Sequence, residues 1–367
     1  MKRSSVVVIA LALVAVLAGA WYMFWPHTSL PVDPLAAVPA DSYGVAHIRV
    51  DRVLASDAWK RLIVERGQAK GIERVQVLCG FNPLDRIKEL TVFARPAPGG
   101  GLPKLAFAAR GELNHQELLD CVKKFTGGDD SALTREDIEG IPTVQSKKGS
   151  SRAAFIGRDG IVGGDAESVA AVIHTVLQKA PSLSGDLMMK QLYAELEQGS
   201  DITLVSRLPE EAKPMIRQLA TVAGPKVELL EEIKLFGVTV VTSSAKLAGG
   251  ITLVTGSTAE ANAFVELGKN AIGRLLTIPG IGMTPAYGVL KTVQSEVRGD
   301  RATFSGLIKV ASVETLLELA PALEAFAGDM VPGAKPDASK PTPAPAPAPT
   351  IEQLQPEEPP TKKRKKD

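Results

Sequence analysis

Aromatic residues and surplus charge are both scarce in this sequence. Phe, Trp and Tyr make up 5% of the 367 residues, and the formal net charge is +1 at pH 7. This balance argues against a surface devoted to nucleic acid, which is usually strongly basic. Hydrophobic residues still reach 45%, so we expect a packed core, built mainly from Val, Leu, Ile and Ala. The length suits two domains of ordinary size.

Histidine is also rare, and no histidine stands in a metal-binding pattern. None of the four has a second His, Cys or carboxylate at the spacing that a metal site needs. The sequence also lacks Gly-x-Ser-x-Gly and a phosphate-binding Gly-Lys-Ser/Thr loop. We therefore predict no catalytic, cofactor or metal site and expect each histidine to be structural or solvated; the four are His27, His47, His115 and His174.

Two short stretches share part of a functional motif without meeting its requirements. Ser243-Ser244-Ala245-Lys246 has the Ser-x-x-Lys spacing of penicillin-recognising enzymes. That chemistry places the serine at the start of a helix, whereas a hairpin turn is predicted here. Residues 129–140, DDSALTREDIEG, are acidic but lack the central glycine of a calcium loop. We predict a solvated loop there.

Only two cysteines are present, Cys79 and Cys121. In an oxidising compartment they could form a disulfide. They could equally be two small buried hydrophobic side chains, because Cys121 borders an apolar stripe in the helix predicted for NHQELLDCVKKF, residues 114–125. The sequence leaves both alternatives open.

The long hydrophobic run of the sequence stands at the N-terminus. Lys2 and Arg3 precede twenty uncharged residues, 6–25, which as a helix would span about 30 Å, the thickness of a bilayer's hydrocarbon core. The basic residues predict a cytoplasmic N-terminus, with the bulk of the chain exported across the inner membrane. We predict an uncleaved single-pass anchor over residues 1–26. The alternative is secretion to the periplasm after cleavage at Ala20, because Ala18-Gly19-Ala20 has the small-x-small form of a cleavage site.

Part of the sequence occurs twice. TVQSKKGSSRAAF starts at Thr143 and TVQSEVRGDRATF starts at Thr292, with seven identical residues in thirteen. The flanking patterns are collinear, since IKELTVFA (87–94) and IKLFGVTVV (233–241) are each followed by a turn, a second strand and a helix. We interpret the chain as a duplication. Both helices open with a capping box, formed by Asn114 with Glu117 and by Ser257 with Glu260.

Each unit is predicted to contain a strand, a helix, a second short helix, a β-hairpin, a helix, another hairpin and a helix. Hairpins imply antiparallel strands, and the interleaved helices would cover one face of the sheet. The fold class is therefore α+β, with two tandem similar units at residues 36–181 and 188–328. A linker at residues 27–35 precedes them, and the turn-rich APSLSGD, residues 180–186, is the seam.

The composition changes in the tail, residues 329–367. PTPAPAPAP (341–349) is predicted to be extended and disordered, because alternating Pro and Ala supply no core-forming side chains. The tail ends in basic residues that would either contact an anionic envelope surface or remain solvated; they are Lys362, Lys363, Arg364, Lys365 and Lys366.

Two further stretches, VPADSYGVAHIRVD (38–51) and CGFNPL (79–84), stand behind the predicted anchor. In this arrangement they resemble a group of uncharacterised bacterial membrane-anchored envelope proteins of the domain-of-unknown-function type, with exported α+β repeats. The resemblance covers residues 35–330. It implies a bacterial origin and a cell-envelope location, and it implies no activity and no catalytic residues.

These features favour a membrane-anchored, extracytoplasmic protein that binds or scaffolds and is not an enzyme. Duplicated modules without clustered titratable residues suit recognition of an envelope protein or of an anionic envelope polymer, without a cofactor. One alternative is a hydrolase of envelope polymers whose site is assembled from residues distant in sequence. The other is a carrier of an apolar ligand. A cleft with convergent carboxylates would support the hydrolase, and a large apolar cavity would support the carrier.

Overall fold

The computed structural model describes residues 29–65, 70–97, 103–125, 133–147, 150–210, 213–214, 217, 225–242 and 246–313. The predicted anchor at residues 6–25 and the predicted tail at residues 329–367 lie outside these ranges. Within them, no helix combines the length and the apolar composition that a bilayer crossing requires.

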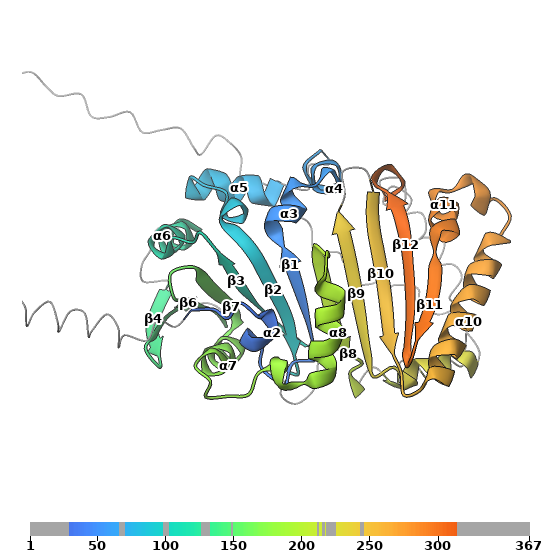
Figure 1. The fold of residues 1–367 in the computed structure, drawn as a ribbon. Helices are drawn as coiled ribbons and strands as arrows, with labels where there is room; N and C mark the ends of the chain where they lie inside the picture. Colours follow the sequence, from blue (N-terminus) through green and yellow to red (C-terminus); the bar gives the residue numbers. More distant parts are fainter. Residues whose placement is uncertain are drawn as a thin grey trace, which may run out of the picture. The chain divides into compact units, whose positions relative to one another are not determined.

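Within the described ranges, twelve strands form one sheet in which every pair is antiparallel (Figure 1). The prediction of an α+β fold with antiparallel strands is confirmed. From edge to edge the order is β11-β12-β10-β9-β8-β1-β2-β3-β7-β6-β5-β4. The strands are β1 (Gly44–Arg49), β2 (Ile87–Arg95), β3 (Lys104–Gly111), β4 (Leu133–Ile138), β5 (Ile141–Ser146), β6 (Ser151–Ile156), β7 (Gly160–Asp165), β8 (Ile202–Arg207), β9 (Leu235–Thr242), β10 (Lys246–Val254), β11 (Gln294–Arg298) and β12 (Arg301–Lys309).

Helices connect these strands. The α-helices are α2 (Pro34–Ala37), α3 (Val50–Ala55), α4 (Asp57–Trp59), α5 (Lys70–Cys79), α6 (His115–Phe125), α7 (Ala166–Val176), α8 (Leu187–Glu197), α10 (Thr258–Leu276) and α11 (Pro285–Thr292). The described chain also has a π-helical segment, η1 (Lys60–Val64), and the 3₁₀ segments η2 (Pro83–Arg86), η4 (Leu183–Gly185), η6 (Pro225–Glu232) and η7 (Ile281–Met283). The N-cap half of each predicted capping box forms, since Asn114 Oδ1 accepts from Glu117 N at 3.2 Å and Ser257 Oγ accepts from Glu260 N at 3.3 Å. The Glu260 carboxylate accepts from Gly256 N at 2.7 Å and not from the N-cap residue.

The helices lie on both faces of the sheet, so the prediction that they cover one face is wrong. On one face, α2, α7 and α8 pack in front of the strands in Figure 1, and Leu192 of α8 is buried with Phe93 of β2. On the other face, Phe264 of α10 packs with Ala302 of β12. Alternate residues of a strand point to opposite faces. Because many strands are apolar at both sets of positions, both faces need cover.

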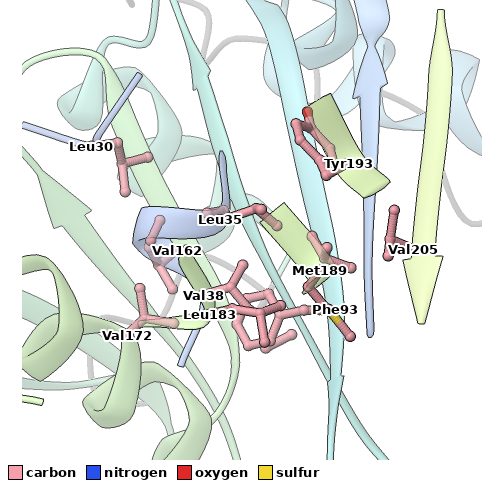
Figure 2. Close-up of a cluster of buried hydrophobic side chains, with 14 of the residues drawn as sticks. Leu30, Leu35, Val38, Phe93, Val162, Val172, Leu183, Met189, Tyr193 and Val205 are labelled. Atoms are coloured by element: carbon pink, nitrogen blue, oxygen red, sulfur yellow. The ribbon is translucent and has the colours of Figure 1, made fainter. Parts of the chain in front are cut away.

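The main core lies under α2, α7 and α8 (Figure 2). Figure 2 shows Leu183 among these side chains, close to Val38 and Phe93. Leu183 is fully buried, and its N–H donates to the carbonyl of Val38 at 2.8 Å. The stretch predicted as a polar seam, residues 180–186, therefore contributes to the core, because its one large apolar residue points inward.

The strands on either side of the central pair β1–β8 follow a similar order. Outward from β1 the order is β1-β2-β3-β7-β6-β5-β4, and outward from β8 it is β8-β9-β10-β12-β11. In the first half, β1, β2 and β3 lie side by side, and β7 comes next, followed by β6. In the second half, β8, β9 and β10 lie side by side, and β12 comes next, followed by β11. The first half adds the hairpin β4–β5 at its edge. The matched TVQS stretches do not occupy corresponding places, since β7 separates β6 from β3, whereas β12 pairs directly with β10.

Residues 133–138 correct a second prediction, because they form the edge strand β4 and not a solvated loop. β4 pairs with β5 across a tight turn, in which Glu139 and Gly140 both have positive φ angles, 56° and 82°. Such angles suit the two-residue hairpins that match strand twist. The charged residues that suggested a loop are tolerated here, because an edge strand is partly open to water.

Candidate functional site

One face of the sheet is apolar in the first half and rich in glycine and threonine in the second half. A row of directly paired residues crosses seven strands on this face. In the first half the row is apolar and lies under helices, whereas in the second half it continues with glycine and threonine. From β3 to β12 the row is Ala106, Phe93, Val45, Val205, Gly237, Thr252 and Thr303.

The second-half part of this face forms an open trough of about 380 Å³. Its floor is β9, β10 and β12, with β11 along one side and Leu196 of α8 on the other. Figure 1 shows no labelled helix in front of β10 and β12 on this face. The described side chains that line the trough carry no charge, and they are mostly threonine, serine, glycine and small aliphatic residues.

Hydroxyl groups cover much of the trough floor. The Oγ1 atoms of Thr252 and Thr303 lie 3.2 Å apart on neighbouring strands. A Cβ atom at Gly250 would lie 3.0 Å from Thr239 Oγ1. Because glycine has no side chain, it leaves space above the strand at this point of the floor. Hydroxyls both donate and accept hydrogen bonds. The floor can therefore bind neutral polar groups.

Two exposed aliphatic side chains stand beside the hydroxyls. Val241 of β9 is 36% exposed and Leu307 of β12 is 46% exposed. Single exposed aliphatic side chains are ordinary on a protein surface, so these two add apolar contact area to the trough and do not by themselves mark an interface. The described residues that line this floor include no acid or base, although Glu296 of β11 pairs with Thr303 on the same face, at its edge.

A buried polar cluster lies on the same face in the first half. His47 of β1 is 4% exposed, and its Nδ1 lies 3.3 Å from Thr91 Oγ1 on β2. Glu89 pairs with Arg110 at 2.5 Å. Burial lowers the pKa of His47, against the smaller effects of nearby carboxylates, so the imidazole is neutral at pH 7. Burial, and then the carboxylate of Glu197, raise the pKa of Tyr193.

The space beside this cluster is small. The cavity lined by Glu89, Thr91 and Arg110 has room for about 20 Å³, which suits about one water molecule. A polymer substrate cannot enter a space of this size. The cluster therefore joins β1, β2 and β3 in the core and does not supply the cleft with convergent carboxylates that a hydrolase would need.

The cysteines and the described histidines lie apart from the trough. Cys79 at the end of α5 and Cys121 in α6 form a disulfide, with their Cα atoms 4.7 Å apart. His115 opens α6, where its ring lies 4.7 Å from that of Phe155, and burial lowers its pKa. His174 stands in the last turn of α7.

The other predicted positions are only partly covered by the structure. Lys246 opens β10, while Ser243 and Ser244 lie outside the described residues. His27 lies outside them as well. So do the five basic residues of the tail, Lys362, Lys363, Arg364, Lys365 and Lys366. In the part of the chain that is described, no three His, Cys, Asp or Glu side chains gather in a way that could hold a metal ion.

The sequence matches no protein-family model and no curated protein. Three crystal forms of TP0453 are similar in structure, at 12–13% sequence identity and TM-scores of 0.42–0.44. The similarity covers 78% of this chain and 97–98% of TP0453. At these TM-scores the similarity carries no argument about function.

Proposed function

We propose that this protein is a non-enzymatic binding module held on the outer side of the inner membrane of a bacterial cell envelope. The uncharged run at residues 6–25, behind Lys2 and Arg3, supports the anchor and its orientation. The disulfide between Cys79 and Cys121 supports the location, because disulfides persist in oxidising compartments such as the periplasm.

The trough is the observation that carries the binding function. In the first half of the sheet, the same face is closed by α7, whose Val172 is fully buried in the core. In the second half, the trough over β10 and β12 is hydroxyl-rich, and no helix of the described residues covers it as α7 covers the first half. The trough spans about three strands at roughly 4.8 Å each. That width accepts one α-helix, which is about 10 Å across. A helix of a second envelope protein is therefore the occupant that fits.

The residues that line the trough indicate which side chains a partner helix should present to it. Its lining carries no charge, which disfavours an anionic polymer as the occupant. Glycine at position 250 and threonine at position 252 let a helix backbone approach closely, and Leu307 offers an apolar contact at the rim. The partner helix should accordingly present small and uncharged side chains to the trough. An apolar carrier is less well supported, because the trough is open and rich in hydroxyls.

The two halves of the sheet support an origin by duplication. Their common strand order, β1-β2-β3-β7-β6 against β8-β9-β10-β12-β11, is the pattern that two copies of one unit would give. On this account, α7 follows the last strand of the first copy, and the described chain ends at residue 313, just after the last strand of the second copy.

The test places a photo-crosslinking residue in the trough of the full chain in living cells. Leu307 faces the trough and Ile251 faces the opposite side of the sheet, and the two are 46% and 47% exposed. We expect position 307, and not position 251, to give an adduct with one envelope protein through a helical peptide. Adducts of equal yield at both positions, or an adduct only with the chain's own residues, would exclude the trough as the partner site.

A further inference from the structure

The last turn of α10 and its connection to α11 expose an unusual set of apolar side chains. Leu275 is 43% exposed, Ile278 is 48% exposed and Met283 is 95% exposed. They belong to an uncharged stretch of sixteen residues, 275–290, LLTIPGIGMTPAYGVL. A soluble surface seldom concentrates large apolar side chains on one connection. We call residues 275–284 the apolar loop.

The apolar loop is ordered by its own backbone. Ile278 N donates to Leu275 O at 3.2 Å, Ile281 N to Ile278 O at 3.1 Å, and Met283 N to Gly280 O at 3.0 Å. Gly280 has a φ of 85°, which a glycine adopts without strain. Because these N–H groups are paired internally, moving them from water toward hydrocarbon costs less than it would for unpaired groups. The exposed apolar side chains therefore belong to a loop whose backbone is held in one conformation by its own hydrogen bonds.

The charges next to the apolar loop in the sequence are basic, although Lys269 is paired with Glu266 of α10 at 3.1 Å. Arg274 lies in the last turn of α10, immediately before the uncharged stretch. Lys291 follows the stretch, with its Nζ 4.5 Å from the centre of the Tyr287 ring. From residue 267 to residue 295 the chain contains three basic residues and no acidic residue; the basic ones are Lys269, Arg274 and Lys291. Apolar tips flanked by cations match the interface of a bilayer that contains anionic lipids.

The position of the loop in the fold agrees with a membrane contact. The chain enters the described fold at Leu30, which packs beside Gly160 at the start of β7. The strand registers place the start of β7, the end of β12 and the start of β11 at the same end of the sheet. The apolar loop leads through α11 into β11 at that end (Figure 1).

The predicted anchor would hold this end of the sheet near the membrane. Trp25, the last residue of the uncharged run, lies five residues before Leu30, which allows a reach of at most about 18 Å. Across the sheet, β7 and β11 are eight strand spacings apart, or roughly 40 Å. An anchor at one side and a second contact at the other would fix how the sheet stands on the bilayer.

We infer that the apolar loop, with Leu275, Ile278 and Met283 at its surface, inserts into the interface of an anionic lipid bilayer as a second membrane contact. The orientation this gives rests on the proposed anchor, whereas the insertion itself does not. With both membrane contacts in place, the exposed side of the trough would keep one orientation relative to the membrane.

The test uses the full chain, reconstituted into vesicles of phosphatidylcholine and phosphatidylglycerol. Single cysteines are introduced at Ile278, Met283 or Leu187 and labelled with an environment-sensitive fluorophore without reductant, so that the Cys79–Cys121 disulfide stays closed. Leu187 is the matched control, because it is 79% exposed at the start of α8, at the opposite end of the sheet. A fourth label at Val14 reports the predicted anchor independently.

We expect blue-shifted emission and quenching by spin-labelled lipid at positions 278 and 283, and neither at position 187. Ile278→Asp with Met283→Asp, both at exposed positions, should leave the circular dichroism spectrum unchanged and abolish quenching of a label at position 275. Labels at 278 and 283 that behave like the label at 187 would overturn the inference, whatever the label at Val14 shows. Quenching at 283 without quenching at 14 would instead retain the loop contact and remove the anchor.

Discussion

Leu196 of α8 lies directly against Gly237 of β9, at the side of the trough. A Cβ atom at position 237 would lie 2.1 Å from Leu196 Cδ1 and 3.6 Å from Leu192 Cδ2. The absent side chain therefore lets α8 sit close to the sheet, and α8 in turn bounds the open face of β10 and β12. The width of the trough depends on this contact.

Gly237→Ala should destabilise the protein, because Leu196 or the whole of α8 must move to admit the methyl group. Overpacking of this kind costs about 1–3 kcal/mol. Urea denaturation of the purified protein measures it. Gly249→Ala on the neighbouring strand is the control, since its added Cβ would meet nothing closer than Thr239 O at 3.7 Å. Equal stability losses in the two variants would contradict the described contact.

Opening the disulfide should lower stability as well. Cys79 and Cys121 are 42 residues apart in sequence, and closing a loop of that length in the unfolded chain is worth about 4 kcal/mol in the chain-entropy treatment. Cys79→Ser with Cys121→Ser should therefore lower the midpoint of thermal unfolding, and dithiothreitol should lower it for the native chain alone. If the thiols of protein taken from the periplasm react freely with maleimide, the bridge does not form there.

The stability of the protein should fall on mild acidification. Burial lowers the pKa of His47 in the folded state, so below a pH of about 6.5, the ordinary value of histidine, the unfolded chain binds a proton that the folded chain refuses. Unfolding free energy is then lost as the pH drops from there to the folded pKa. His115 should add to this loss, because burial lowers its pKa too.

His47→Gln tests the contribution of His47 to this pH dependence. The variant should show a smaller loss of unfolding free energy between pH 7.5 and pH 5.5 than the native chain, measured by urea denaturation at each pH. The remaining dependence of unfolding free energy on pH should become smaller again when His115→Gln is added. An unchanged slope in the double variant would mean that neither histidine is buried as a neutral ring.

The anchor should remain on the mature protein. Protein extracted from membranes is expected to keep the residues before Ala20, as N-terminal sequencing or intact mass would show. Ala18→Leu with Ala20→Leu removes the small-x-small pattern and should leave the size and the membrane fraction of the protein as they are. A native N-terminus at Trp21, shifted to Met1 in the variant, would establish cleavage instead.

Local signals in the sequence predicted the elements of the fold better than their arrangement. The capping residues Asn114 and Ser257 marked true helix starts, and alternating β-branched residues marked true strands. The edge strand β4 was missed because its charged residues, such as Glu136 and Asp137, are as common in loops as at a sheet edge. The joining of all strands into one sheet was missed because it depends on the pairing of β1 with β8, which no local pattern specifies.

The trough could not be read from the sequence for a related reason. Gly237, Thr252 and Thr303 are far apart in the chain, and only the registers of β9, β10 and β12 place them in one row. A weak signal was present in β10, where Gly249-Gly250 interrupts an otherwise apolar strand, because glycine inside a strand often marks a close approach by another group.

The binding role of the trough is tested most directly by filling it. Ser305 is exposed on the trough side of β12, so Ser305→Trp should occupy the floor while leaving the fold unchanged, and Ser305→Ala is the matched control. With the photo-crosslinking residue at position 307, the account predicts that the adduct with the envelope protein disappears in Ser305→Trp and persists in Ser305→Ala. An adduct of undiminished yield in a folded Ser305→Trp protein would show that the partner binds elsewhere.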